Sequence, residues 1–335
     1  MQTKEYSKTD VENMPLGRLV LAIKGSKYWG NENRDQQLRD EIAIIINKIV
    51  ENGLIYCHLL RLVIVSCDLP NEIPRWQRQL GEPEVITSNS KEETAGKTFL
   101  WGNGSPEATY GVIILPESLA FALVEVHDEL NFRNRAKCIF IHELAHVHNM
   151  FFLLRALGPF TFPMNNDWHG IRNAIARTIY DEFLSELIAS IYLENYSIDD
   201  ETLNTGNFVS GCLKRIELSI SEYFKDGNIL TMWNYSSAEM SSLFNHIARA
   251  IGFLFSLEDY DSSSAEKFYK EINNISPGWG GIVCHLISEI ILLSEKQTWQ
   301  PGILQGLEDI VEKGFHVVGL YPKYDNQGLK VDVRY

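Results

Sequence analysis

The sequence has few cysteines, and none of them forms a CxxC pair. Five cysteines are scattered over 335 residues, which is an odd number for a disulfide framework. This usage is typical of reduced thiols in a cytosol. We therefore expect no disulfide bonds and a cytoplasmic location. The cysteines are Cys57, Cys67, Cys138, Cys212 and Cys284.

Long apolar runs are also missing. The two most apolar stretches, Leu54–Cys67 and Ile282–Leu293, are each interrupted by a histidine and a charged residue. A membrane-spanning helix needs about 20 apolar residues without such breaks. Residues 1–11 read MQTKEYSKTDV, which lacks the apolar centre of a signal peptide. We expect neither a membrane segment nor export.

Positive charge is scarce. Thirty Lys and Arg residues face forty-four Asp and Glu residues, so the formal net charge is −14. Such a surface repels nucleic-acid phosphates and anionic lipids, and we expect neither as a partner. The hydrophobic and charged fractions, 45% and 22%, are those of an ordinary folded chain that can bury a core without disulfide or metal staples.

The first part of the chain alternates helical and strand patterns. Residues 31–52 have helical periodicity, and Gly53 stands where a helix C-cap is expected. Short runs rich in β-branched and aromatic residues then predict strands. These runs are residues 59–67, 97–102 and 110–116. We expect residues 1–130 to form a small mixed sheet with helices.

Helical patterns dominate the rest. Long helices are predicted over residues 131–157 and 171–194, separated by the Pro-, Gly- and Asn-rich segment 158–170. Five further helical segments follow between residues 208 and 313, and a turn at DNQG suggests a terminal hairpin. The sequence thus predicts an α+β protein in three parts: an N-terminal α/β part (1–130), two long helices (131–200) and a mostly helical C-terminal region (201–335).

The first long helix contains the sequence HELAH, from His142 to His146. Four residues make little more than one helical turn, so both imidazoles project from one face about 6 Å apart along the axis, where they can bind one Zn²⁺. Glu143 lies on an adjoining face, where its carboxylate can reach an attacking water. The flanking residues are apolar, and unpaired polar groups in a buried helix are costly. We predict His142 and His146 as metal ligands and Glu143 as the general base.

A catalytic zinc usually has three protein ligands, so a third is expected downstream. In the second long helix, Glu182 and Glu186 share a face at i, i+4, and two like charges on a largely apolar helix are unfavourable. A metal at Glu182 and an imidazole N–H at Glu186 would remove the conflict. We therefore predict Glu182 as the third ligand and Glu186 as the partner of a ligand histidine. Asp181 points elsewhere and is expected to be solvated.

Structural alternatives exist for each of these residues. HELAH can be an accidental pattern on a structural helix. Glu182 can instead pair with Arg172 or Arg177, or remain exposed. His148 falls on a different face from His146, which favours a partly buried histidine over a ligand. The same interpretation applies to the remaining isolated histidines, His127, His246, His285 and His316.

At residue level, the pattern resembles the gluzincin metallopeptidases, in which HExxH is followed by a glutamate on a later helix. Here Glu182 follows His142 by forty residues. The segment EFLSELIASIYL is similar to the glutamate helix of the ImmA/IrrE-like branch, with small residues Ser185 and Ala189 at the third and seventh positions after the glutamate. The resemblance covers residues 108–195. It implies that the strand near residues 110–115 forms the edge along which a peptide lies.

The resemblance also implies a reaction, the hydrolysis of a peptide bond with Zn²⁺ as cofactor. We expect a peptidase that acts on a specific intracellular protein partner. His169 is the first candidate for stabilising the oxyanion and Tyr180 the second, while residues 158–170 would wall the cleft or cover it. The alternative is a non-catalytic protein that binds a metal or a partner and retains only the peptidase scaffold.

Overall fold

The computed structural model describes residues 5–24, 32–81, 96–124, 130–158, 167–191, 198–257, 262–296, 299–300, 302–325 and 328–334. Within these residues the protein is α+β, as the sequence predicts, with eleven α-helices, a four-stranded sheet and a two-stranded sheet. The chain forms two compact units. Unit 1 comprises residues 1–159 and 188–194, and unit 2 comprises residues 160–187 and 195–335.

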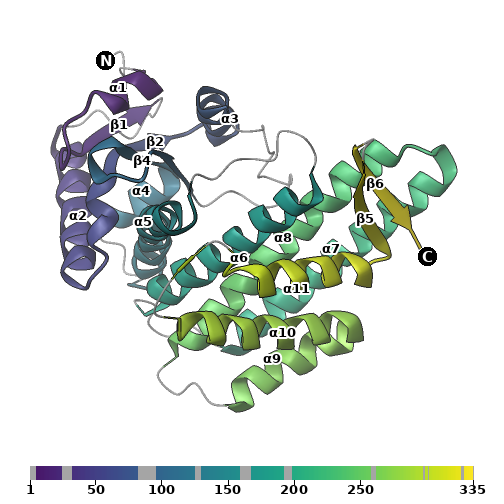
Figure 1. The fold of residues 1–335 in the computed structure, drawn as a ribbon. Coiled ribbons are helices and arrows are strands. Elements are labelled where there is room, and N and C mark those ends of the chain that lie inside the picture. The colour runs from purple at the N-terminus through teal and green to yellow at the C-terminus, as the bar shows by residue number, and fades with distance from the viewer. Residues whose placement is uncertain are drawn as a thin grey trace. The chain divides into compact units, whose positions relative to one another are not determined.

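Unit 1 contains the predicted α/β region (Figure 1). Its elements are α1 (Lys8–Glu12), β1 (Val20–Lys24), α2 (Glu32–Glu51), η1 (Ile55–Leu59), β2 (Leu60–Ser66), α3 (Leu69–Leu80), β3 (Lys97–Gly102), η2 (Pro106–Ala108), β4 (Thr109–Pro116), α4 (Glu117–Val124) and α5 (Leu130–Leu157). Helix α2 and strands β2, β3 and β4 confirm the predicted helix and strands. Gly53 has φ +104°, in the region that favours glycine. Strand β1 and helices α1, α3 and α4 were not predicted.

The four-stranded sheet has the order β1-β2-β4-β3. Strands β1, β2 and β4 are parallel, and β3 pairs with β4 in antiparallel register, with Thr98 opposite Ile113. The prediction that residues 110–115 form the sheet edge is therefore wrong. Strand β4 is interior, because Val112–Leu115 are completely buried between two neighbouring strands. The edge next to it is β3.

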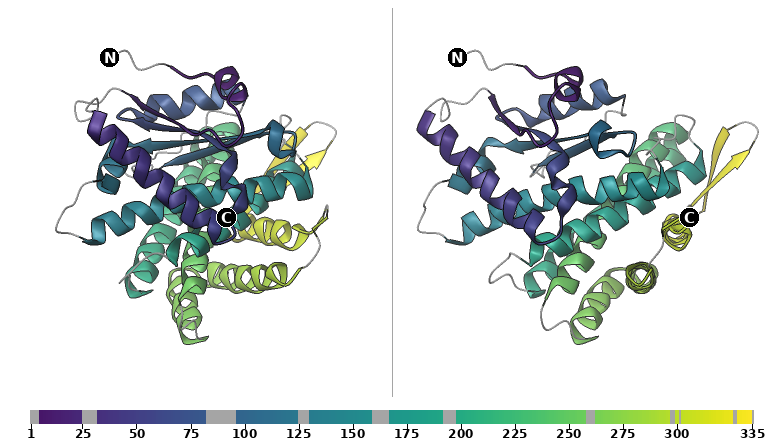
Figure 2. Two further views of the ribbon diagram at one scale, coloured as in Figure 1. Left: turned by 90° about the vertical axis from the view of Figure 1, so that its left-hand side faces the viewer. Right: turned by 60° about the vertical axis from the view of Figure 1, so that its left-hand side comes forward.

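Helices cover both faces of this sheet, as Figure 2 shows for α2 on one side and α3 on the other. Val63 and Ile113 belong to the core shared with α2, α4 and α5. Their neighbours Leu62 and Val112 belong to the core shared with α1 and α3. Alternate residues of a strand face opposite sides, and strands buried on both faces read as continuous apolar runs. This explains the unbroken apolar sequences of β2 and β4.

Unit 2 is mostly helical. Its elements are α6 (Trp168–Ser190), α7 (Ile198–Asp226), α8 (Ile229–Ser256), α9 (Ser262–Ile275), α10 (Pro277–Ser294), α11 (Gln305–Val317), β5 (Leu320–Asp325) and β6 (Gly328–Val333). The five predicted C-terminal helices and the terminal hairpin are confirmed. Helix α6 begins three residues earlier than predicted and ends four residues earlier. Its last three residues belong to unit 1, so this one helix contributes residues to both units. Most of the segment 158–170 lies outside the described residues.

Among the described helices, α10 alone has the length and apolar composition that would allow it to cross a membrane. Trp279, Ile282, Val283, Leu286, Ile290 and Leu293 are its buried apolar residues. They face a helical environment, since α10 packs against α8, α9 and α11. Helix α10 thus packs as part of the core of unit 2.

Helices α6 and α8 approach each other closely at Gly252. A β-carbon built on Gly252 would lie 2.4 Å from the carbonyl oxygen of Phe183 and 3.0 Å from the β-carbon of Glu186. Backbone atoms cannot move out of the way without a shift of the helix. The absence of a side chain at this position therefore fixes α8 against the part of α6 that contains Glu182 and Glu186.

We predict that Gly252→Ala destabilises the protein by about 1–3 kcal/mol, the cost of overpacking a tight helix contact. The matched control is Gly281→Ala on α10, where a β-carbon meets no atom within 4 Å. That change should be neutral or stabilise by up to about 1 kcal/mol through helix propensity. Urea unfolding followed by circular dichroism measures both. Equal stability of the two variants would contradict the close contact.

Candidate metal centre

His142 and His146 project from α5 into one small volume. Both are buried, with 8% exposure each, and their Nε2 atoms lie 3.0 Å apart. The rings are nearly perpendicular, at 87°. The apolar residues around them on the same helix, including Leu144, Ala145 and Val147, are fully buried. The helical periodicity of the sequence thus places two nitrogen donors at one point inside unit 1.

This spacing suits a shared cation. With zinc–nitrogen bonds of 2.0–2.1 Å and tetrahedral geometry, two ligand nitrogens on one zinc lie about 3.3 Å apart. The observed 3.0 Å is close to that value. The two nitrogens are thus close enough to share a cation, and equally to share one N–H···N hydrogen bond.

Glu182 completes a group that could hold a metal ion. His142, His146 and Glu182 each offer one ligand atom, and these atoms all lie within 4.8 Å of one another. Two imidazole nitrogens and one carboxylate oxygen are a donor set that zinc accepts. The three residues predicted as ligands are thus gathered in the structure.

Glu143 is held separately, against strand β3. It is buried, with 7% exposure, and the Thr98 hydroxyl lies 2.6 Å from its Oε2 atom and 2.9 Å from its carbonyl oxygen. Gly96 leaves room for this side chain, since a β-carbon there would lie 2.9 Å from Cγ of Glu143. The side chain of the predicted base, which belongs to α5 like the two histidines, is therefore held against β3. No sequence pattern indicates the contact with Thr98.

Glu186 pairs with Arg249 of α8. The Nε atom of Arg249 donates to Oε2 of Glu186 at 3.1 Å, and the Glu186 side chain is only 13% exposed. The predicted partner of Glu186 was a ligand histidine. The structure pairs it with a cation that neutralises one of the two like charges on this face of α6, and its pairing with a ligand histidine stays a prediction.

Arg249, like Thr98, is a residue that no sequence pattern singles out. Burial alone would lower the pKa of Arg249, but the negative charges of Glu186 and Glu182 raise it above its ordinary value. The neighbouring His246 stacks on Phe208 with ring centroids 4.1 Å apart, and burial, together with Arg249, lowers its pKa to about 4. A lone arginine in the apolar run HIARAIGFLF was the available signal. Only the packing of α8 on α6 shows which acid it serves.

The two arginines considered as alternatives for Glu182 have other partners. Arg172 pairs with Glu312 of α11, and Nε of Arg177 donates to Asn173. The expectation that Asp181 is solvated is wrong, because only 8% of it is exposed. It faces the packed side of α6.

Neither candidate for oxyanion stabilisation is placed to act beside Glu182: His169 is too far away, and the Tyr180 side chain is buried in the core. His169 precedes Glu182 by thirteen residues on the same helix, about 20 Å along its axis, and its Nδ1 lies 3.3 Å from Oε2 of the buried Glu308. Tyr180 is buried against Trp299, with ring centroids 4.9 Å apart, and burial raises its pKa to about 12. The structure therefore contradicts His169 and leaves Tyr180 facing the core.

Among the described residues, none of the isolated histidines belongs to the group of His142, His146 and Glu182. His148 accepts a hydrogen bond from the backbone N–H of Tyr56 at 3.4 Å, and burial lowers its pKa. His316 stacks on Tyr321 with centroids 4.5 Å apart. His127 lies outside the described residues.

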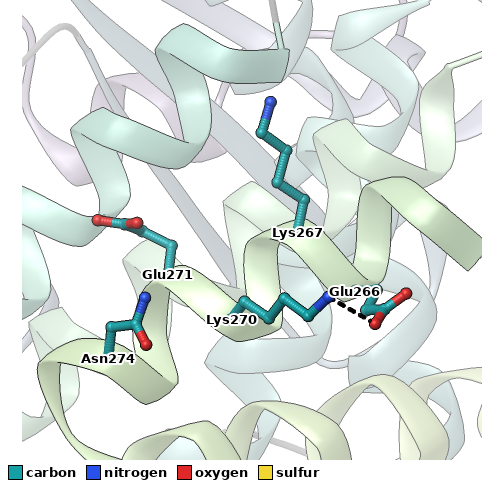
Figure 3. Close-up of a pocket in the computed structure, with 5 residues that line it drawn as sticks. All are labelled: Glu266, Lys267, Lys270, Glu271 and Asn274. Atoms are coloured by element: carbon teal, nitrogen blue, oxygen red, sulfur yellow. Dashed lines mark ion pairs between the residues drawn. The ribbon is translucent and has the colours of Figure 1, made fainter.

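A hollow of about 350 Å³ lies elsewhere, on the surface of α9 (Figure 3). Five polar side chains of that helix line it, and two of them, Lys270 and Glu266, form an ion pair at 2.7 Å. The five residues are Glu266, Lys267, Lys270, Glu271 and Asn274. Alternating charges on one helix face are the usual pattern of a solvated surface. The hollow contains no combination of residues that suggests catalysis.

Comparison with known proteins gives no relative: no family model, no curated protein and no solved structure matches the chain. The geometry described above therefore carries the functional argument.

We predict that Arg249→Met destabilises the metal-free protein by roughly 1 kcal/mol, a shift of about 2–4 °C in the thermal midpoint, because Glu186 loses its counterion beside Glu182. The double variant Arg249→Met, Glu186→Gln should recover part of the loss, since the unpaired charge is then gone. Calorimetry in the presence of a chelator measures the four midpoints of this cycle. Additive losses would show that the pair contributes no coupling.

Proposed function

We propose that the chain is a zinc-dependent peptidase that hydrolyses a peptide bond in a specific protein partner. The observation that carries this proposal is the convergence of the Nε2 atoms of His142 and His146, 3.0 Å apart, in a group with the Glu182 carboxylate. The buried Glu143 lies next in sequence to His142. Together these residues supply three ligands and a base, the minimum that metal-assisted hydrolysis requires.

Helix geometry supports Glu182 as the third ligand. The thiol of Cys138 donates a hydrogen bond to the carbonyl oxygen of Ala189, in the last turn of α6, at 3.4 Å. Cys138 lies one turn before His142 on the same face of α5, and Glu182 lies two turns before Ala189 on the same face of α6. This contact holds the last turn of α6, two turns beyond Glu182, beside the helix of the two histidines within unit 1.

The donor set favours zinc. Hard cations such as Mg²⁺ and Ca²⁺ prefer sites made of oxygen ligands, whereas two neutral imidazoles with one carboxylate suit zinc. When bound at such a site, zinc lowers the pKa of water toward about 7 and polarises the carbonyl group of the substrate.

The residues of this chain would then perform the proton transfers. Glu143 accepts a proton from the attacking water and returns it to the leaving amine, as general base and then as general acid. His142 and His146 remain neutral donors, held by the buried helix α5. Arg249 pairs with Glu186, so one of the two neighbouring negative charges of α6 is offset beside the proposed ligand Glu182.

The partner is proposed to be an extended segment of protein. Strand β3 pairs only with β4 among the described strands, so its outer edge is available for strand addition beside Glu143. The net charge of −14 disfavours nucleic acid and anionic membranes as partners. All five cysteines are free thiols, which supports a reducing compartment such as the cytoplasm.

The first test is metal binding. Purified protein should bind one zinc per chain, and His146→Ala and Glu182→Ala should weaken that affinity by more than about 100-fold, because each removes a direct ligand. Glu143→Gln should retain zinc with wild-type stoichiometry. Competition with a chromophoric chelator measures all four affinities. Wild-type affinity in Glu182→Ala would remove this residue from the ligand set.

The second test is turnover. Zinc-loaded protein incubated with a library of internally quenched peptides should cleave a subset of them, and Glu143→Gln should reduce the rate by about 10²–10⁴-fold because the base is lost. Identical behaviour of the wild type and Glu143→Gln in every assay, with zinc bound in both, would support a non-catalytic metal-binding protein instead.

A further inference from the structure

Glu143 is contacted by Thr98 of strand β3 and approached by Gly96, the residue directly before that strand. Gly96 and Thr98 are two positions apart, and successive side chains of a strand alternate between faces. Both approach Glu143, whereas Phe99, the residue after Thr98, belongs to the core on the opposite face of the sheet. The edge strand therefore forms a wall for the proposed base.

The hydroxyl group of Thr98 has one proton and two acceptors within reach. Oε2 of Glu143 lies at 2.6 Å, and the carbonyl oxygen of Glu143 lies at 2.9 Å. A short O–H···O contact to a carboxylate is typical of a charge-assisted hydrogen bond, which is stronger than one between neutral groups. The proton is therefore best assigned to the carboxylate. Thr98 itself is buried, with 6% exposure, so water competes little for this bond.

Gly96 restricts the same side chain from another direction. A β-carbon at this position would lie 2.9 Å from Cγ and 3.0 Å from Oε1 of Glu143. Only glycine leaves the space that the carboxylate occupies. The Thr98 bond fixes Oε2, and the glycine permits Oε1 to lie beside the strand.

We propose that Thr98 is a positioning residue for Glu143, in the sense that its hydroxyl holds Oε2 and leaves Oε1 as the oxygen that exchanges the proton. This inference rests on the proposed function, because it assigns a task to the general base. It links the edge strand, along which the substrate is proposed to lie, to the base that serves it. General-base efficiency depends on alignment within a few tenths of an ångström, so one hydrogen bond at this place has a measurable effect.

The test uses acetohydroxamic acid as the probe, because a hydroxamate binds zinc as an anion and gives its proton to a neighbouring carboxylate. The variants are Thr98→Val, which keeps the shape and removes the hydroxyl, and Thr98→Ser, which keeps the hydroxyl. Thr98→Val should bind zinc as the wild type does but bind the hydroxamate roughly tenfold more weakly, the loss expected for one hydrogen bond to a charged group. Thr98→Ser should stay within about twofold of the wild type.

A double-variant cycle separates positioning from a structural role. If Thr98 acts through Glu143, Thr98→Val should cause no further loss of hydroxamate affinity in a Glu143→Gln background. An equal loss in both backgrounds, or wild-type affinity in Thr98→Val, would overturn the inference. Should Thr98→Val fail to fold by circular dichroism, Thr98→Ala replaces it in the same cycle.

The same data distinguish the two levels of the argument. A wild-type protein that binds neither zinc nor the hydroxamate, or a Glu143→Gln variant that binds the hydroxamate as well as the wild type, contradicts the proposed function itself. Loss of hydroxamate affinity in Glu143→Gln but not in Thr98→Val contradicts only the role of Thr98.

Discussion

Two imidazoles project from the buried helix α5 to one point, and the candidate metal centre depends on them. His142 and His146 are fixed by α5, whose neighbouring residues are closed off by the core of unit 1. Two neutral nitrogens 3.0 Å apart repel unless a proton or a cation lies between them. This arrangement allows either one N–H···N hydrogen bond between the rings or a shared cation, and the proposed function rests on the second.

The second constraint is the continuity of α6. Its C-terminal turn belongs to the core of unit 1 through Ala189, and its central part packs on α8 in unit 2 through the close approach at Gly252. Glu186 lies in the contact at Gly252, and Glu182 lies one residue before the first residue of that contact, Phe183. The same packing supplies Arg249 to Glu186, so the electrostatic balance of α6 is set within unit 2. The C-terminal region thus supplies the partner of Glu186, although it contains no motif.

Local patterns predicted much of this architecture. The period of 3.6 residues identified α5 and α6, and HELAH identified the two histidines that lie together, because both are properties of one helix. The mixed sheet followed from three apolar runs. What failed depends on contacts between distant segments. No local signal showed that β3 rather than β4 forms the edge, since that is decided by the pairing of β4 with both β2 and β3. The sequence pattern places His169 in the loop between the two long helices. The structure places it in the first turn of α6, which begins at Trp168, about 20 Å along the helix from Glu182. Thr98 and Arg249 had no motif at all.

Zinc K-edge X-ray absorption of the purified protein loaded with one equivalent of Zn²⁺ tests the central claim most directly. The account predicts a four-coordinate spectrum with two imidazole nitrogens and oxygen ligands at about 2.0–2.2 Å, and no sulfur at about 2.3 Å. A spectrum with a sulfur ligand, with fewer than two imidazoles or with the six oxygen neighbours of free aqueous zinc would contradict it.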